Sequence, residues 1–261
     1  MTEPPTSVAS GPGAWERRTS VFLGPGVREV EGAPPLAFRG VDLLGRPDRA
    51  GRFDLVVEPG AVVAVIGDEE SGLEAVGPLA LGLAEPPAGR VEVFGVPIAL
   101  LPYYDLLSFR RHLGYLPQGD GLLQNLTLKD NVALPVRFAT DHRLSEVEAR
   151  VAQLLDDFRL RAIASLRPAQ ATEEDRRRAA LARAVALNPR LVVLELPFVG
   201  LTSRAARELL DRVSRGDDGS ERAILLTSRD LTPAVRDRVT HAVRVVDGAA
   251  IDDTKRESGW R

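Results

Sequence analysis

The chain has 261 residues, of which 44% are hydrophobic and 27% charged, and its formal net charge is −3. This composition predicts one soluble domain with a substantial core, and the small negative charge excludes a general basic field for nucleic acid. Cysteine is absent, which excludes disulfides and thiolate metal sites, and no apolar run approaches the roughly 20 residues of a membrane span.

The two ends of the chain differ in composition from the rest. Residues 1 to about 34 are rich in proline and glycine, which predicts a flexible leader. Within this leader, "TSVFL" at 19–23 is a segment that would suit docking onto another surface. Residues 252–261 are polar, which predicts a frayed C-terminal tail. A folded domain is therefore expected over 35–251.

Apolar strands and amphipathic helices alternate along this domain. Strands are predicted at 53–57, 61–67, 90–95, 113–118, 190–196, 222–230 and 242–248, and helices at 144–164, 172–187 and 203–215. The first of these helices carries Ser145 and Glu148 in the spacing of a capping box. The alternation predicts a mainly parallel sheet covered by helices, the arrangement that buries strands on both faces.

A glycine turn follows the strand at 61–67 and precedes a short apolar helix. In a strand–turn–helix unit, glycines at this spacing let backbone amides cradle phosphate, and the next two residues supply a lysine and a hydroxyl. The turn comprises Gly67, Asp68, Glu69, Glu70, Ser71, Gly72, Leu73 and Glu74. Leucine and glutamate thus stand where a working phosphate loop has its cation and its magnesium ligand. Three further carboxylates add negative charge to the same loop.

The order of the segments resembles the nucleotide-binding subunit of an ATP-binding-cassette (ABC) transporter, from Leu36 to Ile251. "RRHLGYLPQ" is similar to the glutamine loop, with Gln118 in register, and "EPGAVVAVIG" is similar to the strand that enters the phosphate loop. The resemblance implies an α/β P-loop NTPase fold of ABC type. Such a fold has a mainly parallel core sheet, an antiparallel β subdomain and an inserted α-helical subdomain, here at about 119–180.

The same resemblance implies functional positions that this chain fills with other residues. The signature segment, whose serine and amides grip the γ-phosphate in the family, is here Ala171, Thr172, Glu173, Glu174 and Asp175. Glu195 stands in the slot of the magnesium-binding aspartate, and Leu196 in that of the glutamate that polarises water. Arg229 replaces the switch histidine. Leucine cannot accept a proton, so the resemblance implies a degenerate catalytic site.

Carboxylates near two helix starts suggest how these loops are ordered without a nucleotide. Thr172 with Asp175 imitates a capping box at the signature segment, and Ser71 with Glu74 does so at the phosphate loop. Both helix ends that hold phosphate in the family are therefore expected to bind their own carboxylate.

Two functional classes remain open. The first is a catalytically impaired structural or regulatory subunit that needs no cofactor, located in the cytoplasm and peripheral on the inner face of the membrane. The second is an ATPase that still binds ATP with magnesium and hydrolyses it slowly. Either would bind a membrane permease, with the contact expected near 118–138, and possible further partners are a competent ABC ATPase or a second copy. Nucleic acid is not expected. The segment 115–138 is also similar to ATPases of Mla and Mce lipid transport.

Overall fold

The computed structural model describes residues 22–24, 27–45, 51–139 and 142–254. Its centre is a six-stranded sheet in the order β12-β11-β5-β10-β9-β8. Neighbouring strands are parallel except for the β11–β12 pair. The strands are β5 (Val62–Ile66), β8 (Leu113–Leu116), β9 (Leu191–Glu195), β10 (Ala223–Ser228), β11 (His241–Val246) and β12 (Ala249–Asp252). The predicted mainly parallel sheet is confirmed.

Both faces of this sheet are buried along its central strands, because alternate side chains of β5, β9 and β10 enter different apolar clusters. In β5, Ala64 and Ile66 join the cluster that holds the larger helices, whereas Val63 and Val65 join the cluster beneath the second sheet. A strand buried in this way reads as an apolar run, which is why these strands could be recognised in the sequence.

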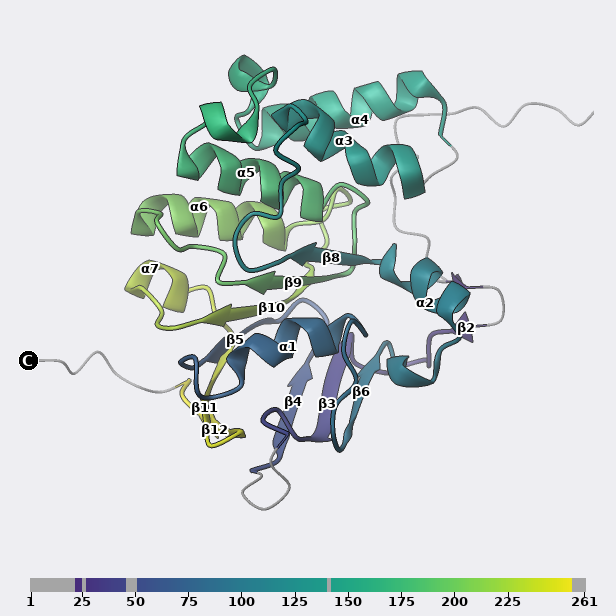
Figure 1. The fold of residues 1–261 in the computed structure, drawn as a ribbon, viewed down its shortest axis with the longest axis vertical. Coiled ribbons are helices and arrows are strands. Elements are labelled where there is room, and N and C mark those ends of the chain that lie inside the picture. The colour runs from purple at the N-terminus through teal and green to yellow at the C-terminus, as the bar shows by residue number, and fades with distance from the viewer. Residues whose placement is uncertain (1–21, 25–26, 46–50, 140–141, 255–261) are drawn as a thin grey trace, which may run out of the picture.

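The second sheet is antiparallel and has the order β4-β3-β6-β7. It comprises β3 (Leu36–Val41), β4 (Phe53–Val57), β6 (Arg90–Val93) and β7 (Val96–Pro97). The helix α1 (Leu73–Ala80) lies between the two sheets (Figure 1). Its buried face, with Val76 and Leu79, packs in the same cluster as Phe38 and Val93 of the antiparallel sheet. This sheet is the expected β subdomain.

The other face of the central sheet is covered by a stack of helices, visible in Figure 1 above β8 and β9. The stack and its neighbours are α2 (Tyr103–Arg110), α3 (Leu128–Ala139), α4 (Leu144–Asp157), α5 (Glu173–Ala184), α6 (Ser203–Ser214) and α7 (Pro233–Arg236). Short 3-10 turns lie at Ile98–Leu100, Arg161–Ile163 and Pro168–Gln170. Among the described residues, no helix combines the length and apolar character that crossing a bilayer requires.

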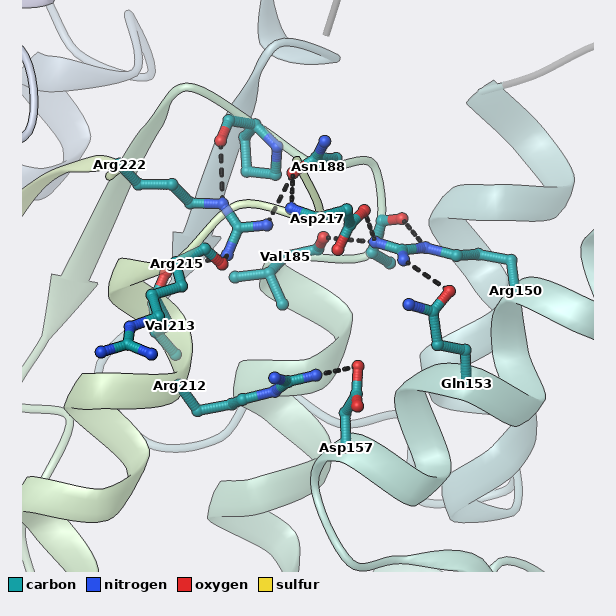
Figure 2. Close-up of polar contacts among 12 residues, drawn as sticks. Arg150, Gln153, Asp157, Val185, Asn188, Arg212, Val213, Arg215, Asp217 and Arg222 are labelled. Atoms are coloured by element: carbon teal, nitrogen blue, oxygen red, sulfur yellow. Dashed lines mark hydrogen bonds and ion pairs between the residues drawn. The ribbon is translucent and has the colours of Figure 1, made fainter. Parts of the chain in front are cut away.

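A buried polar network joins α4 to the central part of the molecule (Figure 2). The Arg150 guanidinium donates to the Ala186 carbonyl at 3.0 Å and pairs with Asp217 at 2.8 Å. Arg222 is also buried and donates to Asn188 Oδ1 at 2.7 Å. These bonds link segments that no local sequence pattern relates.

The first predicted helix begins at 144 as expected but differs in its C-terminal end and in its cap. It spans Leu144–Asp157 and does not continue to 164, because Arg159 adopts a left-handed φ of 58° that no helix propagates. Its N-terminal bond runs from the Arg143 amide to the Glu146 carboxylate at 2.8 Å. The expected Ser145–Glu148 box is therefore wrong by two residues.

Some residues of both predicted tails have contacts with the rest of the described chain. Of the expected leader, β1 (Phe22–Gly24) pairs with β2 (Val27–Arg28), and the Val30 amide donates to the Phe94 carbonyl at 3.0 Å. At the other end, Asp253 is buried beside Arg244. Residues 1–21, including most of the docking segment, and 255–261 lie outside the described residues.

Candidate functional site

The glycine turn of 67–74 connects β5 to α1 as predicted. Gly72 is the N-cap of α1 and has a φ of 87°, a left-handed conformation that glycine adopts without steric cost. A Cβ atom there would also lie 2.9 Å from the Leu43 side chain. The backbone geometry of the turn therefore depends on this glycine, whatever the turn binds.

Polar groups of the turn bond to one another. Asp68 accepts on its carboxylate from the Glu70 amide at 3.1 Å, and its carbonyl accepts from the Ser71 hydroxyl at 2.7 Å. The Ser71 amide also points to that carbonyl, at 3.4 Å. The loop thus directs two of its amides at its own residues, where a phosphate-binding loop directs amides at the ligand.

The two residues after Gly72 point in different directions. Leu73 is 7% exposed and packs in the apolar cluster between the sheets, whereas Glu74 is exposed. The structure gives α1 no side-chain cap. The predicted Ser71–Glu74 box is therefore wrong, because the Ser71 hydroxyl is turned back to Asp68.

A hollow of about 860 Å³ lies over this turn. It is lined by 67–71, by Arg229 after β10, and by 244–247 of β11 and its turn. Arg229 forms an ion pair with Glu69 across the hollow. Both side chains are largely exposed, so the pair contributes little to stability, but it engages one of the two arginines that line the hollow.

Glu195 ends β9 and is buried under α1. Its carboxylate accepts from the Tyr115 hydroxyl at 3.0 Å and from the Gln118 amide at 2.8 Å. A Cβ atom at Gly77 of α1 would overlap this carboxylate. Burial, and then the negative charge of Glu195, raise the pKa of the Tyr115 phenol well above its ordinary value. The tyrosine therefore remains a neutral donor.

Leu196 follows Glu195 and has a left-handed φ of 43°. Such a conformation is strained for a leucine. Its amide is held by the carbonyl and the hydroxyl of Thr227, each at 3.2 Å. The side chain packs against the apolar cluster beneath the antiparallel sheet and brings no proton acceptor to the hollow.

The signature segment lies at the start of α5. Thr172 is the N-cap, and its hydroxyl accepts from the Asp175 amide at 3.2 Å and donates to the Asp175 carboxylate at 2.6 Å. The predicted Thr172 cap is thus confirmed, but the Asp175 carboxylate bonds to the Thr172 hydroxyl and not to the Thr172 amide, so the second half of the box is not formed. Glu174 binds Arg178 at 2.6 Å, and the Glu173 carboxylate lies against Gly200.

The loop after Gln118 is fastened to α5 by arginines. Arg176 pairs with Asp120 at 3.1 Å, and Arg177 donates to the Gly119 carbonyl. Arg183 donates to the Asp120 carbonyl at 3.1 Å. Burial lowers the pKa of Arg177 and of Arg183, and Asp120 opposes that shift in both.

The structure brings only some of the predicted residues together. The turn 67–71 shares the hollow with Arg229, and Glu195 lies behind it under α1. The signature segment 171–175 does not line that hollow and lies beside Gly200 instead. The glycine turn and the signature segment therefore do not share one hollow within this chain.

Comparison with known protein families gives a match that includes both the glycine turn and the signature segment. The family described as ABC transporter matches residues 51–199. The chain belongs to the ABC transporter family. Its ATP-binding domain is 32% identical over 184 residues to the ABC transporter ATP-binding protein YvcR of Bacillus subtilis, covering 70% of each chain.

Other relatives of this ABC domain carry transport names. It is 32% identical over 213 residues to the methionine import ATP-binding protein MetN of Caulobacter vibrioides, covering 80% of this chain but only 64% of MetN. A solved structure of the ATP-binding cassette MJ0796, a dimer bound to ADP and Pi, superposes with a TM-score of 0.73 at 22% identity. That match covers 87% of this chain and 99% of MJ0796. Because the identity to MJ0796 is 22%, this likeness shows the fold alone.

The residues of this ABC domain do not provide the contacts that ATP with magnesium requires. Leu73 provides no cation, and the oxygens of Glu195 already accept from Tyr115 and Gln118. Arg229 is paired with Glu69. Triphosphate and Mg²⁺ need a cation at the phosphates and oxygen ligands directed at the metal. The cation position is the apolar Leu73, Glu195 and Arg229 are engaged, and the exposed Glu74 would bring a negative charge beside the phosphates.

Sequence reasoning missed two residues of this site. Tyr115 holds Glu195, and Gly77 makes room for it. A glycine inside α1 was a usable signal, because glycine in a helix costs about 1 kcal/mol relative to alanine and often has a packing reason. Nothing local in β8 distinguishes Tyr115 from an ordinary sheet residue.

Proposed function

We propose that this ABC domain is a non-catalytic subunit with a structural or regulatory role, bound to a membrane permease on the inner face of the cell membrane. The observation that carries the proposal is the turn 67–74. It has no cation of its own, it bonds to itself through Asp68, and Glu69 engages Arg229. In addition, Leu196 has no group that could act as a catalytic base.

The electrostatic cost to nucleotide binding is large enough to decide the outcome. A unit charge at about 4 Å is worth roughly 4 kcal/mol at an effective dielectric of 20. Replacing a lysine by Leu73 removes one such attraction, and Glu74 adds a repulsion. Each 1.4 kcal/mol changes affinity about tenfold. We therefore expect no binding of ATP with magnesium at millimolar nucleotide.

The permease is expected to occupy a groove of about 330 Å³ between α2, α3 and α5. Its walls include Leu107, Pro135 and Leu187 together with arginines, and Phe138 stands beside it with 78% of its surface exposed. An exposed apolar rim around a concave surface is typical of a protein interaction site. Of the segment 118–138 that the sequence predicted, Pro135 lines this groove.

A competent ABC ATPase and a second copy are further partners in this proposal. In a sandwich dimer each site joins one phosphate loop to the partner's signature segment. Here both 67–74 and 171–175 are altered, so neither composite site would be complete even beside an intact partner. In a homodimer the carboxylates of both segments would face each other, and this repulsion disfavours nucleotide-driven closure.

The cargo stays a prediction. Lipid transport rests on the segment 115–138 alone, whereas MetN is named for methionine import. Both are compatible with a subunit whose own task is to bind a permease.

Isothermal calorimetry with ATP and Mg²⁺ tests the proposal. The natural chain should give no binding heat, whereas Leu73→Lys combined with Glu74→Ser should restore binding without hydrolysis, since Leu196 remains. Leu73→Met is the control for packing at this buried position, and thermal unfolding of each variant verifies that it is folded. Micromolar affinity in the natural chain would refute the proposal.

The alternative is an ATPase that retains slow turnover. Light scattering after size-exclusion chromatography, with and without ATP and Mg²⁺, distinguishes the two. We expect one mass in both conditions. A nucleotide-dependent shift to a dimer would favour the active ATPase.

A further inference from the structure

The segment between β2 and β3, residues 29–35, is fixed at both of its ends, and we call it the strap. Upstream of the strap, β1 lies beside α2, and downstream Leu36 begins β3 of the antiparallel sheet. Inside the strap, the Ala33 amide donates to the Val30 carbonyl at 3.0 Å and closes a turn around Gly32. The strap therefore follows a defined path between α2 and the antiparallel sheet.

The turn between β6 and β7 carries a strained residue beside the strap. Phe94 and Gly95 have positive φ angles of 50° and 76°, as a two-residue hairpin turn of type I′ requires. Asparagine and glycine are favoured at the first of these positions, and a bulky side chain there is strained. Phe94 is nevertheless buried, with 2% of its surface exposed. Such strain persists only where the surrounding structure holds the residue, so the ring of Phe94 should have a role beyond the turn.

The strap holds the backbone of this turn. The Val30 amide donates to the Phe94 carbonyl at 3.0 Å, and the Phe94 amide donates to the Pro35 carbonyl at 3.1 Å. The lack of a side chain at Gly95 makes room for the strap, because a Cβ atom there would lie 2.6 Å from the Val30 Cβ and 2.7 Å from the Ala33 Cβ. The strap and the turn are thus one unit of the antiparallel sheet.

Arg190 connects this unit to the central sheet. It precedes β9, and its carbonyl accepts from the Ala223 amide at the start of β10 at 2.9 Å. Its guanidinium lies 4.9 Å from the centre of the Phe94 ring and pairs with Glu29 of the strap at 2.5 Å. The side chains of Arg190 and Glu29 are 34% and 25% exposed, and this partial removal of water strengthens both the cation–π contact and the ion pair.

We propose that Glu29, Phe94 and Arg190 form a clamp through which the strap sets the position of the antiparallel sheet on the central sheet. The clamp depends on the Phe94 ring, because a bulky residue at a turn position that favours asparagine needs a compensating contact. When the clamp is broken, the apolar layer between the sheets still holds them together, but their relative position varies. This inference goes beyond the proposed function and requires neither a nucleotide nor a permease.

The substitution Phe94→Asn distinguishes a clamp from an ordinary turn. Asparagine suits a positive φ, so the turn by itself should tolerate it, whereas the clamp loses the ring beneath Arg190. Arg190→Met removes the cation, and Glu29→Gln removes only the ion pair. In a chain that already carries Phe94→Asn, Arg190→Met should have a smaller effect than in the natural chain, because the ring contact is already absent.

Distances between the two sheets measure the clamp directly. The natural chain lacks cysteine, so Arg39→Cys on β3 and Arg204→Cys on α6, both exposed, can carry a pair of spin labels. Double electron–electron resonance should give a narrow distance distribution with the natural clamp and a broader one with Phe94→Asn or Arg190→Met. Amide hydrogen exchange at Val30 should accelerate about tenfold in Arg190→Met, which corresponds to about 1.4 kcal/mol of local protection.

Two glycines provide a matched pair of variants, Gly95→Ala and Gly219→Ala. Both positions have left-handed φ angles, 76° and 80°, so alanine is strained at either one. At Gly95 the new Cβ would meet the strap, whereas at Gly219 no atom of the described chain lies within 4 Å of it. We expect Gly95→Ala to broaden the distance distribution and Gly219→Ala to leave it narrow.

An unchanged narrow distribution in both Phe94→Asn and Arg190→Met would overturn the clamp, and equal broadening in Gly95→Ala and Gly219→Ala would do the same. Thermal unfolding verifies that each variant is folded. If Arg190→Met does not fold, the milder Glu29→Gln decides, because exchange at Val30 as slow as in the natural chain would contradict the clamp. These experiments contain no ATP, so their failure leaves the proposed function standing, and ATP binding in calorimetry would refute that function without changing their results.

Discussion

Replacing Arg150 with methionine should destabilise the protein strongly, because this arginine makes several bonds in the buried network of Figure 2. Its side chain is fully buried and makes bonds in three directions. It pairs with Asp217 at 2.8 Å, donates to the Ala186 carbonyl at 3.0 Å, and donates to Gln153 at 3.2 Å. Methionine preserves much of the volume but none of the donors.

The magnitude follows from what the substitution leaves behind. Removing one member of a buried ion pair costs about 3–5 kcal/mol, because the other charge stays without compensation. The Asp217 side chain is 22% exposed, so water can solvate it in part and the lower end applies. The Ala186 carbonyl loses a donor as well, at a cost of about 1–3 kcal/mol that overlaps with the first. We expect a loss of about 3 kcal/mol.

Urea denaturation measures this loss. With m of about 1–3 kcal/mol/M, the midpoint should fall by roughly 1–3 M. The control is Arg161→Met, which breaks an exposed pair with Asp156 and should leave the midpoint unchanged. Adding Asp217→Asn to Arg150→Met should recover part of the loss, because it removes the charge left behind. A midpoint in Arg150→Met as high as in Arg161→Met would refute the reasoning.

Two further predictions concern helix starts. Thr172→Ala should lower the free energy of unfolding by about 0.5–2 kcal/mol, because α5 loses its cap, whereas Glu74→Ala should stay within about 0.5 kcal/mol, because α1 has no such cap. An equal loss in both, measured by thermal unfolding, would contradict the assigned caps. The Arg143 amide holds the pKa of Glu146 below its ordinary value. The ionised Glu146 carboxylate therefore stabilises the fold at pH values above its ordinary pKa. This stabilisation is lost as pH falls through the lowered pKa of the folded state. Glu146→Gln should flatten the acid side of the melting-temperature profile, and an unchanged profile would contradict this.

Much of the fold could be predicted from the sequence because the signals are local. The strand Leu191–Glu195 is an apolar run, and such a run of five buried residues needs a sheet covered on both sides. The helix at 203–215 was predicted to within one residue of its observed end, since its apolar side chains recur at helical spacing. The altered glycine turn was also visible, because Gly67, Gly72 and Leu73 are near neighbours in the chain.

The local sequence pattern did not distinguish a capping motif that forms from one that does not. Thr172 caps α5 as predicted, but Ser71, in the same spacing before Glu74, turns its hydroxyl back to Asp68. Gly72 takes the N-cap position in a left-handed conformation, so the preceding serine is no longer placed to reach the helix amides. A capping motif specifies which bonds are available, and the backbone of the turn decides among them.

The sequence by itself determined the sheet, the helices and the loss of charge-handling side chains in the glycine turn, since each depends on residues a few positions apart. Only the tertiary structure decided that Arg229 pairs with Glu69, which lies 160 positions away, and that Glu195 rests between Tyr115 and Gly77. The physical reason is sheet register: β5, β9 and β10 are adjacent in space, so the residues at their ends meet. Which charges then neutralise one another depends on distances of a few ångströms that no local pattern encodes.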